Sequence, residues 1–125
     1  MMLGMHQDVQ QKVLEEINEI YSTETSIDFT MDFLQKFTYL EAVIKETMRL
    51  FPEGPFIGRE PSKEVDLNGF LIPKGAVVLI SIFSMHRDEK YWGTDALKFK
   101  PERFMEELTK PLAFTPFSGK FYIFE

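Results

Sequence analysis

The sequence predicts a mainly α-helical domain with a small β-sheet, which is an α+β fold class. Apolar residues recur at helical spacing in two regions, residues 8–21 and 31–51. Between residues 64 and 83, an Asn-Gly pair and a β-branched apolar run indicate strands instead. The chain has 125 residues, a length that suits one domain with a core of its own.

The first helical region, "DVQQKVLEEINEIY", is amphipathic. Asp8 is the acidic residue expected at or before its first turn, where a negative charge suits the helix dipole. The following "STETS" is typical of a loop. The predicted apolar face consists of Val9, Val13, Leu14, Ile17, Ile20 and Tyr21.

The second helical region spans residues 31–51, and Pro52 ends the helix. Its predicted apolar stripe consists of Phe37, Leu40, Val43, Ile44, Thr47, Met48 and Phe51. Glu46 and Arg49 lie three residues apart and away from this stripe. In isolation they predict an exposed ion pair, which contributes about 0.3–0.5 kcal/mol and has no function. The alternative is that another segment covers this side of the helix.

The segment "KPERF", residues 100–104, is the candidate cover. Arg103 would then share the Glu46 carboxylate with Arg49. Two guanidinium groups around one carboxylate would form a buried charged network that holds a loop in place.

The predicted β structure begins with a hairpin, "EVDL", Asn68-Gly69 and "FLI", because Asn-Gly readily adopts the positive φ angles of a type I′ turn. A second turn at residues 73–75 precedes "AVVLISIF", an apolar run typical of a buried strand.

Composition excludes several classes of function. The net charge of −6 and the sequence pI of about 5.0 disfavour nucleic acid, which requires clustered basic residues. No apolar run is long enough to span a bilayer, so we expect no membrane segment. Because the chain contains no cysteine, disulfides, iron–sulfur clusters and thiolate metal sites are excluded.

Generic catalytic patterns are also weak. The sequence has no Gly-x-Gly-x-x-Gly motif and no P-loop. Ser84, His86 and Asp88 are close in sequence, but residues two apart on a strand lean side by side and do not form a relay. His6 and His86 are the two histidines, which are too few for a His-rich metal site. We therefore expect no metal ligand, and His86 to be structural.

Four motifs in order strongly resemble the cytochrome P-450 family, the haem-thiolate monooxygenases. They are "ETMR" followed by "LFP", then "VDLNGFLIPKGAVVLISIFSMHRDEKYW", then "KPERF", and finally "FTPFSG". Together they cover most of the chain, and the segment "YLEAVIKETMRLFP" is similar in sequence to eukaryotic microsomal members.

The resemblance implies a partial cytochrome P-450 fold. It divides a single partial domain as follows: residues 1–21, the end of a long helix plus the next helix; 31–51, the Glu-x-x-Arg helix; 64–83, the small sheet; 98–119, the meander and the start of the haem loop; and 120–125, a divergent tail.

The resemblance also implies roles for individual residues. Glu46, Arg49 and Arg103 would form the charged triad that locks the meander. Arg59 would pair with a haem propionate, and Phe117 would pack near the thiolate. Lining the substrate side of the haem would be Glu53, Gly54, Pro55, Phe56 and Ile57.

The family pattern is not complete in this sequence. The position expected for the haem-ligating cysteine holds Phe124, and Tyr122 takes the place of the usual basic residue. The acid–alcohol pair that delivers protons to bound oxygen is missing as well. We therefore expect a C-terminal-region fragment truncated before the cysteine, with no catalytic residues and no haem of its own.

An intact member of the family would bind haem and accept electrons from a reductase flavoprotein. It would insert one oxygen atom into an apolar small molecule at the endoplasmic reticulum membrane. This chain is expected to be inactive alone. Two alternatives stay open: a non-catalytic binding or decoy protein, and a non-functional truncated gene product, which the unrelated tail "KFYIFE" favours.

Overall fold

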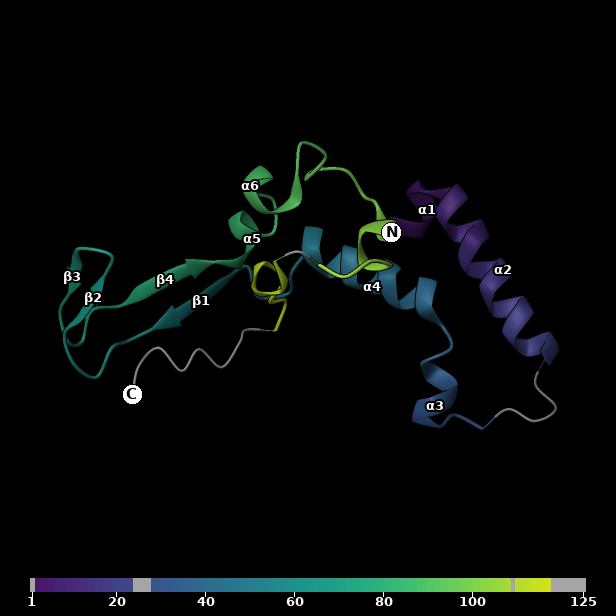
Figure 1. The fold of residues 1–125 in the computed structure, drawn as a ribbon, viewed down its shortest axis with the longest axis horizontal. Coiled ribbons are helices and arrows are strands. Elements are labelled where there is room, and N and C mark those ends of the chain that lie inside the picture. Colours follow the sequence, from purple (N-terminus) through teal and green to yellow (C-terminus); the bar gives the residue numbers. More distant parts are fainter. Residues whose placement is uncertain (1, 24–27, 109, 118–125) are drawn as a thin grey trace. The chain divides into compact units, whose positions relative to one another are not determined.

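The computed structural model describes residues 2–23, 28–108 and 110–117 (Figure 1). It has the predicted α+β class and consists of two compact units. The first unit combines residues 1–48 with 98–109, and the second combines residues 49–97 with 110–125. Helix α4 (Thr38–Leu50) runs from the first unit into the second, so its last two residues belong to the second.

The first unit is helical. Besides most of α4 it contains α1 (Met2–Met5), α2 (Gln7–Thr23), α3 (Met31–Leu34) and the 3-10 helix η1 (Pro101–Phe104). The predicted amphipathic helix is confirmed as α2, which is slightly longer than expected. The core cluster of this unit is Val9, Val13 and Val43, with Leu3, Ile17, Tyr39, Leu40 and Phe99 packed against it.

The second helical region divides into α3 and α4. Lys36 N and Phe37 N donate to carbonyls three residues earlier, which tightens the chain at the end of α3. The predicted apolar stripe is partly wrong, because Ile44 and Phe51 are about half exposed whereas Glu46 and Arg49 are fully buried. The covered side of α4 therefore includes Glu46 and Arg49 together with Val43 and Leu50, whereas Glu41 is exposed.

The second unit contains two separate two-stranded antiparallel sheets. The predicted hairpin is confirmed as β2 (Val65–Leu67) and β3 (Phe70–Ile72), joined by Asn68 and Gly69 with φ angles of 53° and 89°. Asp66 supports the turn, since its Oδ1 accepts a hydrogen bond from Gly69 N at 2.6 Å.

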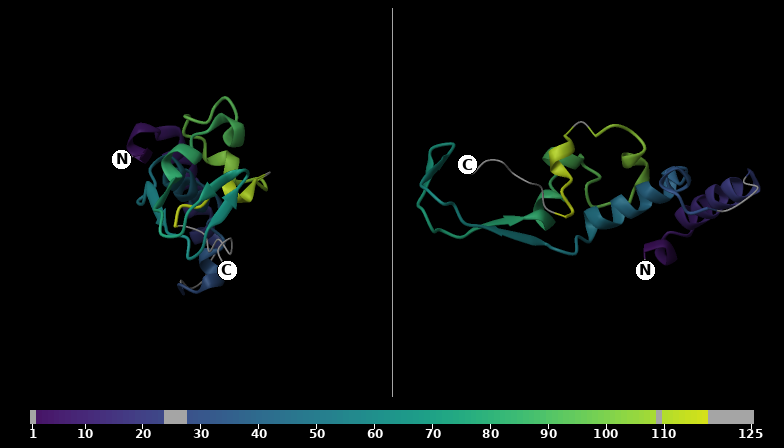
Figure 2. Two further views of the ribbon diagram at one scale, coloured as in Figure 1. Left: turned by 90° about the vertical axis from the view of Figure 1, so that its left-hand side faces the viewer. Right: turned by 90° about the horizontal axis from the view of Figure 1, so that it is seen from below.

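The second sheet pairs β1 (Phe56–Arg59) with β4 (Val78–Ser81), and the two strands run side by side in Figures 1 and 2. The prediction of a buried strand here was wrong: Val77 and Leu79 are 71% and 69% exposed. The physical reason is that a two-stranded ribbon has faces that no second layer covers within the described part of this unit.

Short helices follow β4. They are α5 (Ile82–Met85), α6 (Glu89–Trp92) and the 3-10 helix η2 (Pro111–Ala113). The Ser81 hydroxyl accepts from Ser84 N and the Asp88 carboxylate accepts from Lys90 N, so each caps the helix that follows it. None of the helices in the described ranges is long and apolar enough to cross a bilayer.

Candidate functional site

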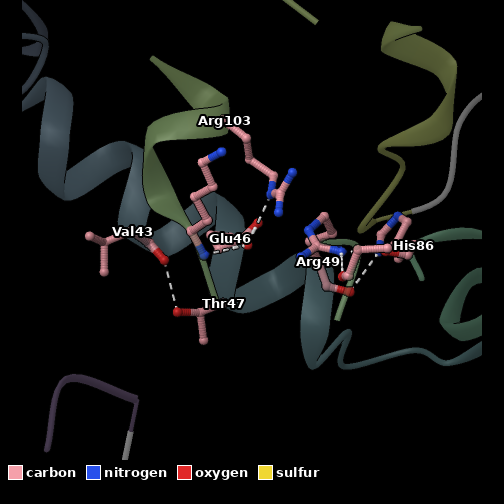
Figure 3. Close-up of polar contacts among 8 residues, drawn as sticks. Val43, Glu46, Thr47, Arg49, His86 and Arg103 are labelled. Carbon is pink, nitrogen blue, oxygen red and sulfur yellow. Dashed lines mark hydrogen bonds and ion pairs between the residues drawn. The ribbon is translucent and has the colours of Figure 1, made fainter. Parts of the chain in front are cut away.

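A buried carboxylate organises the first unit. Glu46 is fully buried on α4, and its Oε1 accepts from Lys100 N at 2.8 Å and from Arg103 Nε at 3.1 Å (Figure 3). The Arg103 side chain is only 11% exposed. Since a buried carboxylate is costly unless it is paired and hydrogen-bonded, these contacts offset its desolvation and pin η1 to α4.

The neighbouring residue of η1 binds the unit's other helices. Glu102 Oε1 accepts from Lys12 Nζ at 2.7 Å and from Tyr39 Oη at 3.0 Å. The hydrogen bond from Lys12 lowers the pKa of Glu102, and the same contact raises the pKa of Lys12. Burial, and then the hydrogen bond to Glu102, raise the pKa of Tyr39. Adjacent side chains of η1 thus contact both α2 and α4.

A third carboxylate, which the sequence analysis did not predict, sets where α4 begins. Glu16 of α2 accepts from Tyr39 N at 2.6 Å and Leu40 N at 2.9 Å, and from the Thr38 hydroxyl at 3.1 Å. These are among the N–H groups that a helix start leaves without intrahelical partners. Glu16 therefore caps α4 from another helix, and no local sequence signal could indicate this.

A buried guanidinium organises the second unit. Arg49 is fully buried, and its Nη1 donates to the main-chain oxygens of His86 at 2.6 Å and Ala96 at 2.7 Å. Its Cζ lies 4.9 Å from the centre of the Trp92 ring. Arg49 thereby fixes the segment that carries α5, α6 and the turn after them.

His86 lies beside Arg49 and is also fully buried (Figure 3). Its Nδ1 is 3.2 Å from Arg49 O, and its Nε2 accepts from Thr115 N at 3.1 Å. Because both ring nitrogens bond to main-chain groups, the geometry supports the structural assignment over a metal ligand. The Ser84 hydroxyl bonds to the Ser81 hydroxyl at 2.8 Å, and Asp88 caps α6. These two hydrogen bonds do not join Ser84 or Asp88 to His86, as a catalytic relay would require.

The residues expected around haem lie in the second unit. Arg59 is half-buried at the end of β1 and donates to Gly58 O at 2.9 Å. Phe117 is 72% exposed. Residues 53–56 are exposed and Ile57 is half-buried. Phe124, the position expected for the cysteine, and Tyr122 lie outside the described residues.

The structure thus brings two of the predicted site residues into direct contact, Glu46 and Arg103, across 57 positions of sequence. Arg49 is held in the second unit by the carbonyls and Trp92 described above. His86, Glu16 and Glu102 were not predicted as parts of these networks.

These features define an α+β chain organised by two buried charged groups, Glu46 and Arg49, three residues apart on one helix. A family model described as cytochrome P-450 matches residues 1–119. The chain belongs to the cytochrome P-450 family.

Named relatives agree with this assignment. The chain is 41% identical over 121 residues to the probable cytochrome P-450 313a1 of Drosophila melanogaster, covering 94% of this chain and 25% of that protein. It is 42% identical over 120 residues to human cytochrome P-450 3A7, covering 94% of this chain and 23% of that protein. The chain therefore spans about a quarter of the length of these curated relatives.

Proposed function

We propose that this chain forms a structural part of a haem-dependent monooxygenase that inserts oxygen into apolar small molecules. Its role is to hold the meander through Glu46, Arg49 and Arg103, and to offer Arg59 to a haem propionate. The observation that carries the proposal is the contact of Arg103 with the fully buried Glu46. A buried ion pair between distant segments needs good geometry and further hydrogen bonds to offset its desolvation. An exposed surface pair has no such requirement.

The residues of this chain fit only part of a haem site. A half-buried guanidinium at Arg59 suits a propionate carboxylate, and an exposed aromatic ring at Phe117 suits an apolar macrocycle. The 125 residues contain no cysteine, however, and the described ranges hold no group of three His, Asp or Glu side chains arranged for a metal. The chain alone therefore lacks the thiolate, and we propose that it is not catalytic by itself.

The electron donor proposed for the whole enzyme is a reductase flavoprotein, and its proposed location is the endoplasmic reticulum membrane. Both proposals rest on membership of the family, which includes the human relative named above.

A chimera tests the structural role. Residues 1–117 replace the matching segment of human cytochrome P-450 3A7, and the reduced, carbon monoxide-bound spectrum is recorded. We expect the chimera to retain the parental band. Arg103→Ala should lose most of it, because the buried Glu46 carboxylate then loses its contact with the Arg103 guanidinium. The control is Lys45→Ala, which removes an exposed pair with Glu41. Equal spectra for the two variants would contradict the proposal.

The same spectrum tests the activity of the chain alone. With added haem, reductant and carbon monoxide, we expect the unaltered chain to produce no thiolate-type band. The appearance of that band would contradict the claim that this chain is inactive by itself.

A non-catalytic binding protein is the second candidate, and one observation favours it. An apolar groove of about 440 Å³ in the first unit is open to solvent, and Met31, Leu34 and Ile44 are among its exposed lining residues. If binding were the function, Ile44→Asp should abolish capture of a partner while R103A in the chimera leaves the haem spectrum unchanged. The monooxygenase proposal expects the haem spectrum to respond to R103A.

A further inference from the structure

His86 makes contacts that determine its protonation state. Its Nε2 lies 3.1 Å from Thr115 N, a main-chain N–H that can only donate, so Nε2 must carry a lone pair. Its Nδ1 lies 3.2 Å from Arg49 O, a carbonyl that can only accept, so Nδ1 must carry the proton. The hydrogen bonds are satisfied together only by a neutral imidazole protonated at Nδ1.

The surroundings of the ring also disfavour a second proton. On one side, the Arg49 guanidinium donates to the main-chain oxygen of His86 itself. Next in the chain, Arg87 donates to Leu50 O, and burial followed by the charge of Arg49 lowers the pKa of Arg87. The imidazole is thus fully buried, and a cationic guanidinium is hydrogen-bonded to the main chain of the same residue.

Aromatic and acidic groups complete these surroundings. Phe114 stacks on the ring at 5.5 Å between centroids, and Trp92 meets it at 6.3 Å, edge to face. Of the nearby carboxylates, Asp88 caps Lys90 N, and the half-buried Asp95 directly precedes Ala96. The two ring-nitrogen hydrogen bonds go to main-chain atoms, so these carboxylates are not partners in them.

We infer that His86 is a positioning residue: its neutral ring ties the main chain at Thr115 to the end of α4, and protonation of Nε2 releases that tie. A second proton occupies the lone pair that accepts from Thr115 N, so the two N–H groups face each other and the hydrogen bond is lost. Thr115 lies two residues before Phe117, and the link to the haem loop rests on the proposed function.

The chain contains its own reporter for this event. Trp92 is the single tryptophan of the sequence and contacts the His86 ring, and a charged imidazole beside an indole changes its fluorescence. The test follows Trp92 emission of the full chain from about pH 8 to about pH 4, which includes the ordinary histidine range and extends below it because the surroundings disfavour the second proton. We expect the emission to fall reversibly as the pH is lowered.

The two histidines supply a matched pair of variants. His86→Gln keeps an acceptor but cannot titrate, so it should lose the acid transition. His6→Gln changes the histidine that packs on Phe99 in the first unit, at 4.7 Å between ring centroids, and should keep the transition. An unchanged transition in H86Q, or its loss in H6Q, would overturn the inference.

A second measurement needs no variant. Nitrogen-15 correlation spectra of the imidazole rings in the unaltered chain, at about pH 8, distinguish the tautomers. We expect a ring protonated at Nδ1 for His86, and a ring protonated at Nε2 would overturn the inference. Because neither measurement involves haem, their outcomes stay separate from those of the chimera.

Discussion

The two units bury charge of opposite sign in different ways. In the first, the Glu46 carboxylate meets the guanidinium of Arg103 and one main-chain N–H. In the second, the Arg49 guanidinium meets two main-chain carbonyls and the face of Trp92. Yet Glu46 and Arg49 are three residues apart on one helix, and both are fully buried.

The difference shows how each unit responds to a change of charge. Glu46 is paired with a formal opposite charge, so removing either partner takes a charged contact away from a buried group. The hydrogen bonds of Arg49 to carbonyls hold the main chain at His86 and Ala96 in place. We therefore expect the first unit to be the more sensitive to loss of a charged partner, whereas the acid response proposed for His86 belongs to the second unit.

The largest expected effect is on the first unit. Glu46→Ala should lower the free energy of unfolding by about 3–5 kcal/mol, because Arg103 and Lys100 N lose their buried acceptor. Amide hydrogen exchange at Lys100 measures the loss directly. The matched control is Glu41→Ala on the same helix, which removes an exposed i,i+4 pair and should cost about 0.3–0.5 kcal/mol. Similar losses in both variants would contradict the buried network.

The next largest loss of stability is expected in the second unit. Arg49→Lys should cost about 2–3 kcal/mol, because an ammonium cannot reproduce a planar guanidinium that bonds carbonyls and stacks on Trp92. Urea unfolding followed by Trp92 fluorescence measures it. Arg59→Lys serves as the control, since Arg59 is half-buried and bonds to its neighbour Gly58. R49K should be clearly the less stable of the two.

A smaller effect concerns the start of α4. Glu16→Gln should cost about 1 kcal/mol, because a neutral amide oxygen replaces the carboxylate that accepts from Tyr39 N and Leu40 N. Circular dichroism during urea unfolding measures the change. Glu15→Gln, whose carboxylate accepts from Gln11 on the same exposed helix face, should be nearly neutral. A larger loss in E15Q than in E16Q would contradict the cap.

The smallest effect is the pH dependence of the Lys12–Glu102 pair, whose side chains are 52% and 42% exposed. The hydrogen bond from Lys12 lowers the pKa of Glu102 below its ordinary 4.5. This stabilisation is therefore fully present above pH 4.5 and is lost as the pH falls through the folded-state value. The difference in unfolding free energy between the unaltered chain and Lys12→Gln should shrink on acidification. A difference that grew would contradict the assignment.

Parts of both units were predictable from sequence because they depend on local chemistry. The period of apolar residues predicted α2, and Asn68-Gly69 predicted the turn between β2 and β3, since its positive φ angles are a property of those two residues. The partner strand β1 was not predicted. Its four residues have no alternating pattern, and antiparallel pairing with β4 supplies what local propensity lacks.

The candidate site, too, was only partly predictable from the sequence. Family motifs selected Glu46 and Arg103, and the structure places them in contact. The role proposed for that contact stays a prediction until the chimera is tested. The helical wheel of α4 put Glu46 and Arg49 on a solvent face, and this was wrong because segments distant in sequence cover that side of the helix. A wheel describes one helix and contains no information about what packs on it.

By itself, the sequence determined the fold class, the hairpin, the absence of a thiolate among these 125 residues, and the motifs of the family. Only the tertiary structure decided which polar groups are buried and what satisfies them: Glu16 at the start of α4, Arg103 on Glu46, and His86 between Arg49 and Thr115. The physical reason is that local propensity acts over a few neighbouring residues, whereas desolvation and hydrogen-bond partners depend on segments that folding brings together.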